Sequence, residues 1–222
     1  MKVVAIANSA GGVGKTTLAH CLAVSFAEFG KKTLLIDLDP AGSLTFRLGY
    51  ENPRISLADF FNGIKLNDSN TETTSERFDF IPTDSRLTSI FSADALSLLL
   101  LDLPKEYEIV LLDLPASLSQ PFALALPVTD LLLVPVRNNL HSLRGYLQVK
   151  SAAADIAISA VAIGPNTFIS NTDLLDESIV ASPEIESAAA AKASILTSDK
   201  SGALAESYRS VGYSILEKLG LE

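Results

Sequence analysis

The chain has 222 residues and a net charge of −9, and apolar residues make up 48% of it. This length predicts a single α/β domain over residues 1–222. The acidic balance argues against a broadly basic nucleic-acid binder but leaves room for a local basic patch. One cysteine excludes an intrachain disulfide and fits a reducing cytoplasm. No apolar run is long enough to span a bilayer, and no basic, cleavable leader begins the chain.

A glycine-rich loop stands between an apolar strand pattern and a helical pattern near the N-terminus. The strand is expected over Val3–Ala7, the loop over Ser9–Thr17 and the helix over Leu18–Ala27. Successive glycines let backbone N–H groups close around an anion, and the helix directs its positive end at the same place. A glycine turn without a ligand is the alternative, but strand, loop and helix together favour a phosphate-binding loop. The predicted nucleotide-binding residues are Gly11, Gly12, Val13, Gly14, Lys15, Thr16 and Thr17.

Carboxylates follow two further apolar runs of the strand type. Asp37 and Asp39 come at the end of the run over 33–38, and Asp113 ends the run over 107–112. Because parallel strands bind ligands at their carboxyl ends, we expect these side chains at the same edge as the glycine loop. Lys15 would reach the β- and γ-phosphates there, and the Thr16 hydroxyl would bind Mg²⁺. The alternative for the aspartates is a helix cap or a turn.

The remaining patterns alternate between strand and helix. Strands are expected over 77–82, 130–136, 157–164 and 178–183, and helices over 44–49, 56–63, 84–101, 142–154 and 202–219. The polar stretch over 67–76 is expected to be a surface loop. Apolar strands joined by helices predict a doubly wound, mostly parallel sheet with helices on both faces.

The motifs resemble those of the ParA/MinD family of partition ATPases, which are P-loop NTPases of the deviant Walker type. The deviant loop of that family reads Lys-Gly-Gly-x-Gly-Lys-Thr-Thr, and its signature lysine falls at Ala10 here. Residues 37–43 resemble the family's Asp-x-Asp-Pro-Gln-Gly-Asn motif, with Ala41 and Ser43 in place of Gln and Asn. Residues 115–118 and the Val-Pro-Val at 134–136 also resemble the family's motifs.

This resemblance implies ATP and Mg²⁺ as cofactors, and Lys15 and Asp39 as the residues that support hydrolysis. Asp39 would orient the attacking water. Asp37 would lie near the magnesium through water, and Asp113 would hold the water shell of the ion opposite Thr16. Asn166 is the candidate contact to adenine, and Pro183 belongs to a loop that closes over the base.

The loss of the signature lysine leaves three possibilities. In the family, two ATP-bound protomers meet face to face, and the lysine reaches the phosphates of the partner. Lys150 is our first candidate for a substitute, ahead of Arg144 and Arg137. Otherwise the protein forms the dimer without such a contact, or it binds ATP and hydrolyses it poorly. A subset that lacks this lysine resembles the McdA-type ATPases that distribute carboxysomes.

The resemblance implies an ATPase that forms a homodimer with ATP, binds non-specific DNA and positions a cargo through an adaptor protein that stimulates hydrolysis. The expected location is cytoplasmic and nucleoid-associated, without a membrane partner. Candidate DNA contacts are Arg144, Lys192, Lys200, Arg209 and Lys218. The alternatives are a MinD-like membrane-associated ATPase and a metabolic ATP-dependent enzyme on the same fold. A nitrogenase-reductase type is excluded, because its iron–sulfur cluster needs more than one cysteine.

Overall fold

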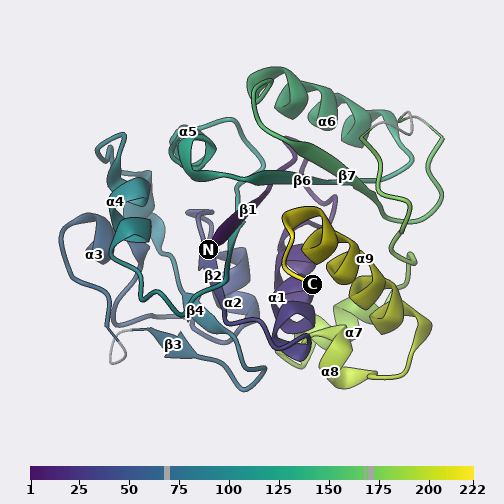
Figure 1. The fold of residues 1–222 in the computed structure, drawn as a ribbon, viewed down its shortest axis with the longest axis horizontal. Helices are drawn as coiled ribbons and strands as arrows, with labels where there is room; N and C mark the ends of the chain where they lie inside the picture. The colour runs from purple at the N-terminus through teal and green to yellow at the C-terminus, as the bar shows by residue number, and fades with distance from the viewer. Residues whose placement is uncertain (68–70, 168, 170–172) are drawn as a thin grey trace.

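A seven-stranded sheet forms the centre of the part of the protein that the structure describes (Figure 1). The structure is a computed structural model and describes residues 1–67, 71–167, 169 and 173–222. Across the sheet the order is β3-β4-β2-β5-β1-β6-β7, and only β3 with β4 is antiparallel. This confirms the doubly wound, mostly parallel sheet. The strands are β1 (Lys2–Ile6), β2 (Thr33–Asp37), β3 (Glu72–Thr73), β4 (Asp79–Ile81), β5 (Ile109–Asp113), β6 (Leu131–Val136) and β7 (Ile158–Ala162).

Helices cover both faces of the sheet (Figure 1). One face packs against α1 (Lys15–Glu28), α2 (Ser43–Arg47), α7 (Glu184–Ala190), α8 (Ile195–Ser198) and α9 (Ala203–Leu219). The other face packs against α3 (Leu57–Phe61), α4 (Ala95–Leu101), α5 (Gln120–Ala125) and α6 (Leu140–Ala152). Two short 3₁₀ turns, η1 (Ser85–Thr88) and η2 (Leu126–Val128), complete the described elements.

Alternate residues of the central strand serve the two helical layers. Val4 and Ile6 join the core with α1 and α9, whereas Val3 and Ala5 join the core with α3 to α6. Successive side chains of a strand point to opposite faces of the sheet. Because helices bury both faces, β1 has to be apolar throughout, and this is why its sequence shows no polar alternation.

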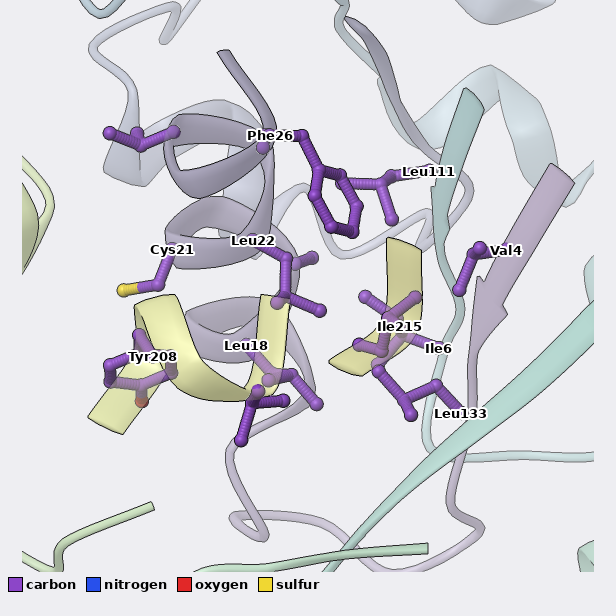
Figure 2. Close-up of a cluster of buried hydrophobic side chains, with 14 of the residues drawn as sticks. Val4, Ile6, Leu18, Cys21, Leu22, Phe26, Leu111, Leu133, Tyr208 and Ile215 are labelled. Atoms are coloured by element: carbon purple, nitrogen blue, oxygen red, sulfur yellow. The ribbon is translucent and has the colours of Figure 1, made fainter. Parts of the chain in front are cut away.

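The helix that follows the glycine loop is fixed between the sheet and the C-terminal helix. Figure 2 shows Leu18, Leu22 and Phe26 of α1 directed at the sheet, with Tyr208 and Ile215 of α9 in the same cluster. All five side chains are at most 2% exposed. Burying large apolar side chains contributes roughly 1.5–3 kcal/mol each, so this packing holds α1 and the loop before it in place.

Three local expectations from the sequence were wrong. The expected helix over 84–101 is interrupted, because Asp84 caps only the short turn η1 and Ser89 has an extended backbone. The expected strand over 178–183 is reduced to one bridge, Ile163 with Ile179, before α7 begins. The expected loop over 67–76 contains the short edge strand β3, and its residues 68–70 lie outside the described part.

Candidate functional site

The glycine loop joins β1 to α1 at the carboxyl edge of the sheet. Gly12 and Gly14 have φ values of 70° and 103°, which favour glycine strongly. A Cβ atom at Gly14 would also lie 2.9 Å from Cδ1 of Ile163. The two conformations let the backbone turn tightly into α1, whose N-cap is Gly14, and backbone N–H groups at such a turn and helix N-terminus suit an anion.

Lys15 folds back over this loop. Its side chain is nearly buried, with 7% of the residue exposed, and Nζ donates a hydrogen bond to the Ala10 carbonyl at 3.1 Å. Burial lowers the pKa of the ammonium, while the carboxylates of Asp113 and Asp39 oppose that shift. A buried ammonium beside one carbonyl is poorly neutralised, so the site favours a further anion such as phosphate.

Two buried carboxylates lie side by side next to the loop. Asp37 and Asp113 are the last residues of neighbouring parallel strands and are paired in register. Both residues are 0% exposed. Burial raises the pKa of Asp37 to about 7 and raises that of Asp113 well above its usual range, with the charge of Asp37 adding to the effect on Asp113. Two adjacent carboxylates that are buried away from solvent need a cation or a proton between them.

The hydrogen bonds of these two carboxylates differ. Asp37 accepts from the Asp39 backbone at 3.0 Å, and from the backbone and hydroxyl of Thr45 at 2.9 and 2.7 Å. Neither oxygen of Asp113 has a hydrogen-bond partner within the described residues. The neighbouring Thr16 hydroxyl, as a side-chain hydrogen-bond donor, and the charge of Lys15 both act to lower the pKa of Asp113, but burial outweighs them. An unpartnered buried carboxylate beside the Thr16 hydroxyl fits Mg²⁺, whereas Asp37 is occupied in holding α2.

Asp39 lies above these groups at the start of a turn. One of its carboxylate oxygens accepts from the Ala41 backbone at 3.0 Å, and its carbonyl accepts from Gly42 at 2.8 Å. The carboxylate is half-buried and acts electrostatically on Lys15. The structure therefore confirms Asp39 as a turn former close to the loop, and its role toward an attacking water stays a prediction.

A cavity of about 390 Å³ opens beside the loop, lined by Gly14, Thr17 and Tyr208. Pro183, the predicted base-loop residue, lies in its wall. Asn166 lies instead in a neighbouring cavity of about 600 Å³. Both cavities share the wall formed by residues 179–181. The structure therefore brings Pro183 to the loop and leaves Asn166 one cavity away.

Lys150, the first candidate for the missing lysine, is engaged elsewhere. Its ammonium pairs with the carboxylate of Asp173, which also accepts from the Tyr146 hydroxyl. Arg144 instead lines a recess of about 150 Å³ together with Ser9 and Ala10. On another side of the loop, Nε of Arg137 donates to the Val13 carbonyl at 3.4 Å. The two arginines therefore flank the loop, whereas Lys150 is neutralised.

The five candidate DNA contacts do not form one patch. Arg209 pairs with Glu28 and Glu206, and Lys192 pairs with Glu51. Arg144 is on α6, which covers the opposite face of the sheet from α9 (Figure 1).

No helix in the described ranges is long and apolar enough to cross a membrane.

Two residues that fix the loop, Asn8 and Gly145, were not predicted from the sequence. Asn8 accepts from the Ala10 backbone at 2.9 Å and donates to the Pro135 carbonyl at 2.9 Å. Gly145 of α6 lies against both Asn8 and Ala10, since a Cβ there would approach the Asn8 Oδ1 to 1.9 Å. The available signal was an isolated glycine inside a helical pattern, which often marks close packing.

Comparison with known proteins agrees with this geometry. A family model described as an AAA domain matches residues 1–159. Soj, the sporulation initiation inhibitor protein of Bacillus subtilis, is 31% identical over 161 residues, covering 67% of this chain and 63% of that protein. The chromosome partitioning protein ParA of Caulobacter vibrioides is 33% identical over 164 residues, covering 67% and 61%. The chain belongs to the ParA/MinD family. It matches less than two thirds of the length of either relative.

Solved structures share the fold at low sequence identity. MinD in the MinC:MinD complex of Aquifex aeolicus has a TM-score of 0.83 at 19% identity, covering 98% of this chain and 96% of that one. The apo McdA of Cyanthece has a TM-score of 0.79 at 20% identity, covering 97% of this chain and 99% of that one. A cobyrinic acid a,c-diamide synthase from Mycobacterium smegmatis, with a bound ATP analogue and magnesium, gives 0.75 at 22%, covering 99% and 95%. At these identities the likeness concerns the fold alone.

Proposed function

We propose that the protein binds ATP with Mg²⁺ and hydrolyses it, and that residues 1–222 act as one ATPase domain. The observation that carries this proposal is the convergence of Lys15 and the unpartnered Asp113 carboxylate on the glycine loop. Thr16 and Asp113 would hold Mg²⁺, which neutralises charge on the transferred phosphate when bound. Asp37 would contribute through its position beside Asp113.

Each protein group has a separate task in this proposal. Lys15 exchanges the Ala10 carbonyl for oxygens of the β- and γ-phosphates. The backbone N–H groups of Gly11 to Thr17 surround the phosphates. The half-buried carboxylate of Asp39 accepts a hydrogen bond from the attacking water and orients it. Pro183 and Asn166 are proposed to contact the base.

The test of nucleotide binding is a titration with a fluorescent ATP analogue, with and without Mg²⁺. Lys15→Ala is expected to abolish productive binding, because a phosphate oxygen loses its charged donor. Asp39→Ala is expected to bind ATP, to lose hydrolysis and to accumulate a dimer in light scattering. An Asp39→Ala variant that turns over at the parent rate would remove Asp39 from its role.

We further propose an ATP-dependent homodimer in which a cation of one protomer reaches the phosphates of the other. Lys150 would have to leave Asp173 to do this, at the cost of breaking an ion pair. Arg144, which lies beside Ala10, needs no such exchange. ATP turnover of Lys150→Ala and Arg144→Ala distinguishes the two candidates. The variant that removes the contact to the phosphates of the other protomer is expected to lose hydrolysis but to keep the ATP affinity of the monomer.

The family supports a positioning role, in which the ATP state binds non-specific DNA of the nucleoid and an adaptor protein links it to a cargo. A carboxysome, as for McdA-type proteins, is one such cargo. Binding to duplex DNA across a salt series, with ATP, ADP or neither, tests this role. Absence of binding in every state at low salt would favour the MinD-like or metabolic alternatives, and vesicle co-sedimentation with ATP would then separate those two.

A further inference from the structure

An arginine of α2 lies against the end of the phosphate loop. NH1 of Arg47 donates a hydrogen bond to Oγ1 of Thr17 at 2.7 Å. Arg47 is the last residue of α2 and is partly buried. It lies outside both the glycine loop and the Asp37–Ser43 motif.

Arg47 has no carboxylate partner within the described ranges of the chain, whose ion pairs involve other residues. By contrast, Arg86 pairs with Asp59 and Asp84, and Arg209 pairs with Glu28 and Glu206. A guanidinium has five N–H donors, and among the described residues only one of those of Arg47 has an acceptor. A charge withdrawn from water is costly unless it is paired. The position therefore suits an anionic ligand.

The surroundings of Arg47 indicate where that anion would lie. Burial raises the pKa of both the Cys21 thiol and the Tyr208 hydroxyl, and the positive charge of Arg47 opposes both shifts. Figure 2 shows Cys21 and Tyr208 close together where α1 meets α9. Tyr208 and Thr17 both line the 390 Å³ cavity. Arg47 does not itself line the cavity, but its guanidinium is bonded to Thr17, which belongs both to the loop and to the cavity wall.

We propose that Arg47 binds the α-phosphate of the nucleotide held by its own protomer. This inference rests on the proposed function. A phosphate loop holds the α- and β-phosphates by its backbone, and its lysine reaches the β- and γ-phosphates. If the base occupies the cavity beside Pro183, the α-phosphate lies between that cavity and the loop. Gly14 and Thr17 are loop residues that line the cavity, and Arg47 is bonded to Thr17.

A contact to the α-phosphate has a definite kinetic signature. ATP and ADP carry the same α-phosphate, so the contact strengthens the binding of both to the same extent. Interactions equal in the ground state and the transition state lower KM without raising kcat. A contact to the γ-phosphate would instead discriminate ATP from ADP. Arg47 is therefore a nucleotide-binding residue in this proposal and has no part in the transfer step.

Arg47→Gln is the variant that tests the proposal, because it keeps an N–H donor for Thr17 while removing the charge. Dissociation constants of Mg-ATP and Mg-ADP are measured on the full chain. We expect both to rise by about 10- to 100-fold and by similar factors, with kcat unchanged at saturating ATP. Arg54→Gln removes an exposed arginine from the loop after α2 and is the matched control, with affinities like those of the parent.

A sulfur substitution separates a direct contact from a general loosening of the loop. ATP with a phosphorothioate at the α-position is compared as its two diastereomers. One diastereomer is expected to bind the parent protein several-fold more weakly than ATP. On Arg47→Gln the same diastereomer and ATP are expected to bind with equal affinity. A loosened loop would leave the sulfur effect intact.

Four outcomes would overturn the inference. These are unchanged affinities in Arg47→Gln, a loss confined to ATP, an undiminished sulfur effect in the variant, and no sulfur effect in the parent. Failure of the parent protein to bind either nucleotide would instead overturn the proposed function. If the parent binds ATP and needs Lys15 to do so, but Arg47→Gln leaves the affinity unchanged, this inference alone is overturned.

Discussion

Gly145 of α6 lies directly against Ala10, the residue at the position of the family's signature lysine. A Cβ at Gly145 would be 2.8 Å from the Ala10 nitrogen and 3.0 Å from its Cβ. Ala10 is 1% exposed, so α6 packs tightly on this residue beside the recess that Arg144 lines. The missing lysine is therefore accompanied by a helix that packs onto the start of the loop.

Gly145→Ala is expected to destabilise the protein by about 1–3 kcal/mol and to weaken ATP binding. The added methyl group would overlap Asn8 Oδ1, whose amide is held by the Pro135 carbonyl. Alanine favours a helix over glycine by about 1 kcal/mol, which is too little to offset that overlap. Urea unfolding and an ATP titration measure both effects. Leu147→Ala, an exposed change on the same helix, is the control. Normal stability and affinity in Gly145→Ala would contradict the close packing.

Asp113→Asn is expected to raise the melting temperature in the presence of a chelator by a few degrees. The pKa of Asp113 is raised well above 3.8 in the folded state, so its ionisation destabilises the fold as the pH rises. The gain from the variant should therefore be larger at pH 8 than at pH 5. The stabilisation by Mg-ADP should be lost.

Asp37→Asn is the contrasting variant. Asp37 accepts three hydrogen bonds through two oxygens, and an amide nitrogen cannot accept any of them. Because burial also raises the pKa of Asp37, this variant is expected to gain some stability, but less than Asp113→Asn, since lost hydrogen bonds offset the removal of a buried charge. Thermal unfolding of both variants measures the difference. A lower melting temperature for Asp113→Asn in chelator would show that its carboxylate is not the unpaired one.

Glu76→Gln is expected to lower stability by about 3 kcal/mol at pH 7. Burial of Glu76 opposes its ionisation, but hydrogen bonds from His20, Thr197 and Ser194 outweigh burial and lower its pKa from 4.5 to about 2. A carboxyl with a lowered folded pKa stabilises fully above its unfolded pKa, and that contribution is lost as the pH falls from 4.5 to 2. Urea unfolding at several pH values measures the difference between the parent and the variant.

The matched control for Glu76 is Glu106→Gln, an exposed carboxyl on the loop before β5. It should change stability by less than about 0.5 kcal/mol. If the difference in unfolding free energy between Glu76→Gln and the parent stays constant down to pH 2, the carboxylate network of Glu76 is not the cause of that difference.

Gly212→Ala is expected to loosen the contact between α9 and α1. The new Cβ would lie 2.3 Å from Ser25 Oγ and 3.1 Å from Ser25 Cβ. We expect a loss of about 1–3 kcal/mol in urea unfolding. Ser25→Ala alone should be neutral or stabilising, because its buried hydroxyl has no hydrogen-bond partner in the described part of the chain. The double variant should recover most of the loss, and strict additivity would rule out the clash.

Local patterns in the sequence were sufficient for the six parallel strands, the doubly wound sheet and the family. A strand buried on both faces needs an unbroken apolar run, as in residues 109–113, and a phosphate loop needs glycines at fixed spacing. Both requirements are met by neighbours in the chain. The strand expected over 178–183 failed because an extended segment forms a strand only where a sheet edge pairs with it, and there it pairs at Ile179 alone.

The surroundings of the loop depended on the tertiary structure. Asn8 meets the Pro135 carbonyl 127 residues away, and Arg47 meets Thr17 30 residues away. The sequence alone determined that the glycine loop, the Thr16 hydroxyl and the carboxylates share one sheet edge. Each of them follows an apolar strand pattern, and the carboxyl ends of parallel strands meet at one edge. Only the tertiary structure decided that Asp113 is unpartnered, that Lys150 is neutralised and that Arg47 faces the loop. Hydrogen bonding and burial at these positions depend on side chains that folding brings together from distant parts of the chain.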